Sequence, residues 1–238
     1  MHRVLFPTVA IVLGALLAPP PLRAQSDDAD LGRLMEAARG RQVPTAPAPT
    51  DPDLIALTDQ LTRIAETQDG DALIALADTE IKLSFGGAYG LAAFREMIAE
   101  PWFWPEFETV LAGGGLLVTD WAEGRGAVFP VVFQLWPADL DPFEYYYGFR
   151  SGAVLRATPA VDASILWEGI EGRVLARGPY LTRFPGLYEE GWYHVCLAEA
   201  GCGFARTDEV RSPLDWRAIF IQSAEGGPWV LKTFIAGD

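Results

Sequence analysis

The spacing of apolar residues changes near residue 144, and this change limits the possible fold more than any other feature of the chain. From Asp51 onward, apolar residues recur every three or four positions, as on helices that are buried along one face. Beyond residue 144, short apolar runs are separated by Gly or Pro, which is typical of short strands joined by tight turns. We therefore predict an α+β protein, with N-terminal helices and an antiparallel sheet before a small β-barrel.

Residues 51–143 predict helices followed by strands. Asp51 stands before Pro52, which is the order expected of a capping residue and the first helical position. The apolar face of this helix is formed by Leu54, Leu57, Leu61 and Ile64. Further helices are predicted at 73–76, 90–98 and 106–112. Strands are predicted at 81–85, 116–121 and 127–133.

The rest of the chain predicts strands alone. Residues 144–211 contain six short apolar runs, at 145–149, 154–157, 164–167, 172–176, 192–197 and 203–205. Two further runs, 216–221 and 229–235, flank a Gly-containing turn and predict a C-terminal β-hairpin within 212–238.

The first 24 residues predict a secretory signal peptide. An apolar run from Val4 to Ala18 is shorter than the roughly 20 residues of a membrane span, and three prolines follow it. Cleavage is predicted after Ala24, and an uncleaved N-terminal anchor is the alternative. The Pro/Ala-rich residues 25–50 predict a linker, in which LGRLMEAAR (31–39) fits one or two helical turns. No later run is apolar enough to span a membrane, so the expected location is periplasmic or secreted.

The charge of the chain argues against nucleic-acid binding. The net charge is −14, which disfavours contact with a polyanion through a general basic field. Most of the excess lies in residues 51–146, which hold four basic and seventeen acidic residues. This acidity indicates either a docking face for a basic partner or cation, or simply the solubility of an exported protein.

The two cysteines predict a disulfide. Cys196 and Cys202 flank a predicted turn, and a symmetric hairpin centred on Glu199 places them opposite each other. An exported chain permits the bond, and two buried free thiols are the alternative.

No motif predicts an enzyme. Apart from His2 in the leader, the only histidine is His194, so a catalytic Cys–His pair would need Cys196, which the disulfide would consume. Two thiols and one histidine fall short of the four ligands of a structural zinc site. We therefore predict no catalytic residues, no metal and no cofactor.

Residues 147–211 carry a likeness to a known family. The segment GAVLRATP (152–159), followed by WYHV (192–195) and GFA (203–205), resembles bacterial SH3-like (SH3b) domains in the order and spacing of its parts. The helix–helix–strand–FGG–helix opening and the C-terminal hairpin are faintly similar to an NTF2-like cone. This second likeness implies that the hairpin packs on residues 51–143, with 144–211 inserted between them.

The SH3-like resemblance implies binding rather than catalysis. The expected partner is a peptide, an envelope protein or peptidoglycan, held in an aromatic groove. The candidate binding residues are Tyr145, Tyr147, Arg156, Tyr180, Phe184 and Tyr188. Strand alternation places Tyr145 and Tyr147 on one face and Tyr146 on the other, and packing in the core or between domains is the alternative for these tyrosines. The alternative function is small-ligand binding or enzymatic activity in an NTF2-like cavity drawing on Phe85, Trp102, Trp104 and Trp121. The sequence gives neither the ligand nor the oligomeric state.

Overall fold

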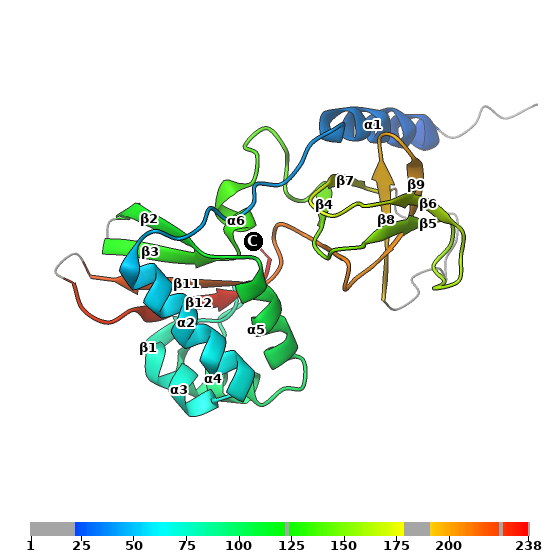
Figure 1. Ribbon diagram of the computed structural model, residues 1–238. Helices are drawn as coiled ribbons and strands as arrows, with labels where there is room; N and C mark the ends of the chain where they lie inside the picture. The colour runs from blue at the N-terminus through cyan, green and yellow to red at the C-terminus, as the bar shows by residue number, and fades with distance from the viewer. Residues whose placement is uncertain (1–21, 122–123, 179–190, 224–225, 238) are drawn as a thin grey trace, which may run out of the picture.

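The computed structural model describes residues 22–121, 124–178, 191–223 and 226–237, and it is an α+β structure (Figure 1). Its strands form two sheets. One sheet has five strands in the order β1-β12-β11-β3-β2, and the other has seven in the order β10-β4-β7-β8-β9-β5-β6. No helix among these residues is long and apolar enough to cross a membrane.

Four helices lie on the five-stranded sheet. They are α2 (Pro52–Thr67), α3 (Gly70–Leu76), α4 (Gly90–Ile98) and α5 (Phe103–Ala112). The strands of this sheet are β1 (Ala77–Lys82), β2 (Leu116–Trp121), β3 (Gly124–Phe129), β11 (Arg217–Gln222) and β12 (Val230–Ile235). The C-terminal hairpin lies inside the sheet, because β11 pairs with β3 and β12 pairs with β1.

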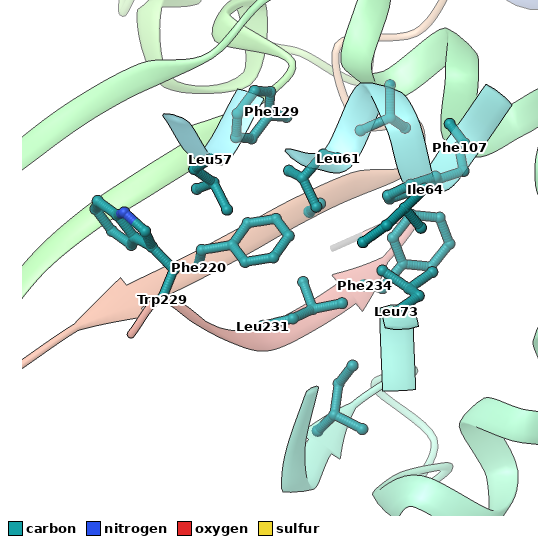
Figure 2. Close-up of a cluster of buried hydrophobic side chains, with 14 of the residues drawn as sticks. Leu57, Leu61, Ile64, Leu73, Phe107, Phe129, Phe220, Trp229, Leu231 and Phe234 are labelled. Carbon is teal, nitrogen blue, oxygen red and sulfur yellow. The ribbon is translucent and has the colours of Figure 1, made fainter. Parts of the chain in front are cut away.

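The main core lies between these helices and the sheet. Figure 2 shows side chains of α2, including Leu57 and Leu61, above Phe220 and Leu231 of the C-terminal hairpin. The apolar face predicted for the first helix is buried at all four positions. The C-terminal hairpin is therefore held by apolar contacts with the helices and by pairing with the strands β1 and β3.

Asp51 begins α2 and also ties it to the sheet. Its carboxylate accepts hydrogen bonds from the backbone N–H groups of Asp53 and Leu54 at 3.0 and 3.1 Å. It also accepts one from the Arg125 guanidinium on β3 at 2.5 Å. These bonds hold the pKa of Asp51 below its usual value, and the bond from the Leu54 N–H has the largest effect.

Replacing Asp51 by alanine is expected to lower the free energy of unfolding by about 1 kcal/mol, because the helix loses its capping oxygen. The pKa of Asp51 is lowered on folding, so this stabilisation is present above its ordinary pKa of 3.8 and is lost as the pH falls through the folded value. Urea unfolding at pH 7 and at lower pH measures both effects. Asp59→Ala, on the exposed face of the same helix, is the control, and an equal loss in both variants would contradict the capping role.

The second sheet contains most of the predicted short strands. They are β4 (Tyr145–Gly148), β5 (Val154–Arg156), β6 (Ile165–Glu168), β7 (Val174–Arg177), β8 (Trp192–Leu197), β9 (Gly201–Arg206) and β10 (Val210–Arg211). The pairings of this sheet among the described residues are antiparallel. They do not close the sheet into a barrel, because β10 and β6 each have one strand neighbour.

The predicted disulfide is present. Cys196 on β8 and Cys202 on β9 are directly opposed partners in the ladder, with their Cα atoms 3.9 Å apart. The hairpin that they join turns at residues 198–200, as its symmetry predicts. The bond therefore links the two strands just inside their turn.

Residues 25–38 of the predicted linker are helical and belong to α1 (Leu22–Ala38), which is longer than the one or two helical turns predicted within 31–39. Leu34 and Ala38 of this helix are buried against Tyr145, Val174 and Cys196 of the seven-stranded sheet. The helix forms because Leu31, Leu34, Met35 and Ala38 share one face, and that face packs on the sheet.

Two other predictions need correction. The strand predicted over 127–133 ends at Phe129, and α6 (Val131–Leu135) follows Pro130, which has no N–H to donate to a strand neighbour. The strand predicted over 81–85 ends at Lys82, and Phe85 is 51% exposed in the loop that follows.

Candidate binding cleft

The tyrosines of β4 do not form the predicted binding surface. Tyr145 and Tyr147 do share one face, as alternation requires, but they are only 2% and 4% exposed. The Tyr145 hydroxyl donates to the Leu34 carbonyl of α1 at 3.3 Å, and burial raises the pKa of Tyr147. Tyr146, on the other face, stacks on Tyr193 with ring centroids 4.6 Å apart. β4 is thus buried on both faces.

The other predicted residues are not brought together with these tyrosines in an open site. Arg156 lies on β5, half-buried, opposite Phe204 of β9 and Ile165 of β6. The remaining candidates, Tyr180, Phe184 and Tyr188, lie outside the described residues. Of the predicted groove residues that the structure describes, the two tyrosines are buried and Arg156 is half-buried.

A cleft instead lies between α5 and the β4–β10 edge of the seven-stranded sheet. Its volume is about 530 Å³. We call it the α5 cleft, and it is lined by Trp102, Pro105, Glu106, Glu108, Thr109, Ala112, Phe149, Arg150, Thr207, Asp208 and Arg211. One wall thus comes from the helical layer and the other from the seven-stranded sheet.

The helical wall of the α5 cleft follows from the spacing of α5. Trp102, Pro105, Thr109 and Ala112 recur every three or four positions and so share one face. The opposite face buries Phe103, Phe107 and Val110 in the main core. Trp102 is 40% exposed and stacks on Trp216 with ring centroids 4.9 Å apart. The core thus orients the helix, and Trp216 supports the exposed indole.

The opposite wall is built around Phe149, which follows β4. The guanidinium groups of Arg150 and Arg211 lie 5.6 and 5.7 Å from the centroid of its ring. The Arg150 guanidinium is held by the Asp208 carbonyl, to which its Nε donates at 3.1 Å. Because Arg150 is exposed, it presents a positive charge beside an aromatic ring at the rim of the cleft.

Arg211 connects the two walls from beneath. Its guanidinium donates to the Glu106 carboxylate at 2.5 Å and lies 3.6 Å from that of Asp215. Burial opposes its charge, but the hydrogen bond to Glu106 and the nearby carboxylates outweigh burial, so the pKa of Arg211 is raised. Burial also raises the pKa of Asp215, more than Arg211 lowers it. The contact between Arg211 on β10 and Glu106 on α5 therefore holds the two walls of the cleft together.

Two further carboxylates give the cleft an acidic rim. Glu108 on α5 is exposed, and Asp208 accepts two hydrogen bonds from Arg206, both at 2.8 Å. The bonds from Arg206 lower the pKa of Asp208, so it is ionised at neutral pH. The α5 cleft therefore offers aromatic surface, one exposed guanidinium and carboxylates within one concavity.

The structure disperses the residues expected to line an NTF2-like cavity. The space between helices and sheet is occupied by the main core, which includes Trp104. Phe85 is exposed, Trp102 lines the α5 cleft and Trp121 lies on the face of the sheet away from the helices. The described residues also contain no group of three or more His, Cys, Asp or Glu that could hold a metal ion.

Comparison with known proteins shows no family. No protein-family model matches the chain, and no curated protein matches it. A solved NTF2-like protein with a cystatin-like fold, from Novosphingobium aromaticivorans, aligns over 90% of this chain and 82% of its own length. Its sequence identity is 12% and its TM-score is 0.24, which is too low to show a shared fold. The SH3-like and NTF2-like likenesses thus remain predictions.

Sequence reasoning missed most of the α5 cleft. The sequence marks Trp102 as a candidate aromatic residue, but nothing in it singles out Phe149, Arg150 or Arg211. The i, i+3, i+7 spacing of Trp102, Pro105 and Thr109 was a usable signal. The meeting of Glu106 with Arg211, 105 positions later, had no signal in a single sequence.

Proposed function

We propose that the protein is a non-enzymatic binding protein of the bacterial cell envelope, and that the α5 cleft holds a short peptide segment. The segment belongs either to an envelope protein or to peptidoglycan, since both present peptide groups with charged ends. The observation that carries the proposal is the exposed Trp102 in one cleft with Phe149 and Arg150.

The dimensions of the cleft suit an extended peptide. The exposed face of α5 runs from Trp102 to Ala112, which is about 15 Å at the rise of an α-helix. An extended chain covers that distance in about four or five residues. Trp102 and Phe149 suit apolar side chains, Arg150 suits a carboxylate, and Glu108 suits an amine or guanidinium.

Two other features support an envelope location. The predicted signal peptide directs export, although residues 1–21 lie outside the described part of the chain. The Cys196–Cys202 disulfide fits an oxidising compartment. The resemblance of 147–211 to SH3-like domains supports a binding role over an enzymatic one.

Binding to isolated peptidoglycan sacculi and to envelope proteins tests the proposal. We expect the purified protein either to pellet with sacculi or, with a photo-crosslinker at Thr109, to capture an envelope protein. In either case Trp102→Ala and Arg150→Ala should weaken binding about tenfold each, as for central aromatic and Arg contacts.

The control is Phe85→Ala, which removes an aromatic ring of similar exposure outside the cleft. Pelleting that depends on Trp102 identifies peptidoglycan as the source of the peptide. Crosslinking without pelleting identifies a protein. Binding that survives both cleft substitutions, or absence of binding in both assays, would refute the proposal.

A further inference from the structure

The five-stranded sheet has a second face, away from the four helices. In Figure 1, α2 crosses in front of β11 and β12, so the first face of the sheet is covered by helix. Ala218 and Phe220 of β11 point into the main core on that side. Ile219 and Ile221 alternate with them and point to the opposite face.

One end of the second face is already covered. Arg217, also on β11, is buried, and its guanidinium lies 4.2 Å from the ring centroid of Phe133 and 5.9 Å from that of Phe85. Phe133 belongs to α6, which packs on β3. These groups close the sheet near Arg217 and leave the part around Ile219 and Ile221 open.

The open part is a groove of about 500 Å³. We call it the sheet groove, and it is lined by Asp78, Glu80, Trp121, Ile219, Ile221, Lys232 and Thr233. Its apolar part is Trp121, Ile219 and Ile221, the last of which is only 8% exposed. Trp121 packs directly against Gly126 of β3, where an added Cβ would lie 2.6 Å from the indole. The glycine thus lets an aromatic ring lie close to the sheet at the side of the groove.

The charges of the sheet groove leave one carboxylate without compensation. The Lys232 ammonium donates to Asp78 at 2.5 Å, and this bond, with a second from the Glu80 N–H, lowers the pKa of Asp78. Asp78 and Lys232 therefore neutralise each other at neutral pH. Glu80 is exposed and makes no ion pair with a described residue. The surrounding residues 51–146 add to the negative potential, with seventeen acidic and four basic side chains.

We propose that the sheet groove binds a small organic cation, an amine or quaternary ammonium group on an apolar body. The cationic group pairs with the Glu80 carboxylate on β1, at one edge of the sheet. The apolar body lies on Ile219 and Ile221 of β11 and extends toward the Trp121 ring on β2, at the other edge. An anion of the same shape is rejected, because Lys232 is already paired with Asp78. This site does not depend on the function proposed for the α5 cleft.

Calorimetric titration of the whole protein with benzyltrimethylammonium tests the site, with 3-phenylpropanoate as the anionic probe and benzyl alcohol as the neutral one. We expect saturable binding of the cation at millimolar concentration and none of the other two. Glu80→Gln removes the ion pair and Trp121→Leu removes the aromatic contact with the apolar body, so each should weaken binding about tenfold.

Two further variants make the test specific. Lys232→Met frees the charge of Asp78, so it should strengthen cation binding about threefold, the opposite sign to Glu80→Gln. Glu108→Gln removes an exposed carboxylate in the α5 cleft and should change nothing. No saturable cation binding, equal binding of the anion, or a Glu108→Gln effect as large as that of Glu80→Gln would overturn the proposal. Since Glu80 is exposed, its variant is informative even if Trp121→Leu fails to fold.

Discussion

Replacing Phe234 by alanine is expected to lower the free energy of unfolding by about 3–5 kcal/mol, the range for a fully buried phenylalanine. Phe234 has no solvent exposure. Its ring centroid lies 5.2 Å from that of Phe103, 6.0 Å from Phe107 and 5.0 Å from Trp216. The truncation thus leaves a cavity where α5 meets the C-terminal hairpin, and packed neighbours fill such cavities only in part.

Urea unfolding followed by circular dichroism measures this loss. Val161→Ala is the control. Val161 lies between β5 and β6 and is 65% exposed, so its truncation should change the free energy of unfolding little. A loss below about 1 kcal/mol for Phe234→Ala would mean that the hairpin contributes little to the core. In that case the packing shown in Figure 2 would not determine stability.

Replacing Arg211 by methionine is expected to cost about 3–5 kcal/mol at pH 7, because it leaves two partly buried carboxylates without their cation. The Arg211 side chain is only 8% exposed, and its partners Glu106 and Asp215 are 23% and 36% exposed. Methionine fills much of the same volume, so the loss reports the charge more than the packing. Arg95→Met is the control, since Arg95 is 56% exposed and its partner Asp71 is 97% exposed.

The cost of Arg211→Met should depend on pH. The pKa of Asp215 is already raised by burial, so its contribution to stability is present below its ordinary value of 3.8 and is lost as the pH rises through the folded value. Without Arg211 that folded pKa rises further, so the variant loses less at pH 5, where Asp215 is more easily protonated. Unfolding measured at pH 5 and pH 7 checks the sign, and an equal cost at both pH values would contradict the role of Asp215.

Local sequence patterns predicted most helices and strands. The capping order of Asp51 and Pro52 located the start of α2, and the alternation of Tyr145 to Tyr147 correctly separated their faces. The sequence pattern did not predict elements whose structure depends on tertiary contacts. α1 is stabilised by packing on β7, and the chain after Pro130 turns into α6 instead of extending the strand.

The candidate site was much less predictable than the fold. Tyr145 and Tyr147 were predicted to bind a ligand, yet α1 and Trp136 cover that face of β4. The α5 cleft instead depends on three segments, which are α5, the chain around Phe149 about 40 positions later, and the chain around Arg211 about 100 positions later. Such juxtapositions are set by how the two sheets meet, for which a single sequence carries no periodic signal.

The position of the C-terminal hairpin has a consequence for the order in which the chain folds. β12 lies between β1 and β11, so the five-stranded sheet cannot be completed until Val230–Ile235 have been synthesised. The seven-stranded sheet contains only strands that end at Arg211 or earlier, and it can pair first. The N-terminal helices must therefore wait, with apolar faces uncovered, while more than 100 later residues emerge, a delay typical of folds dominated by distant contacts. Until β12 pairs, the chain therefore combines a seven-stranded sheet that can already be formed with a helical layer whose own sheet is still incomplete.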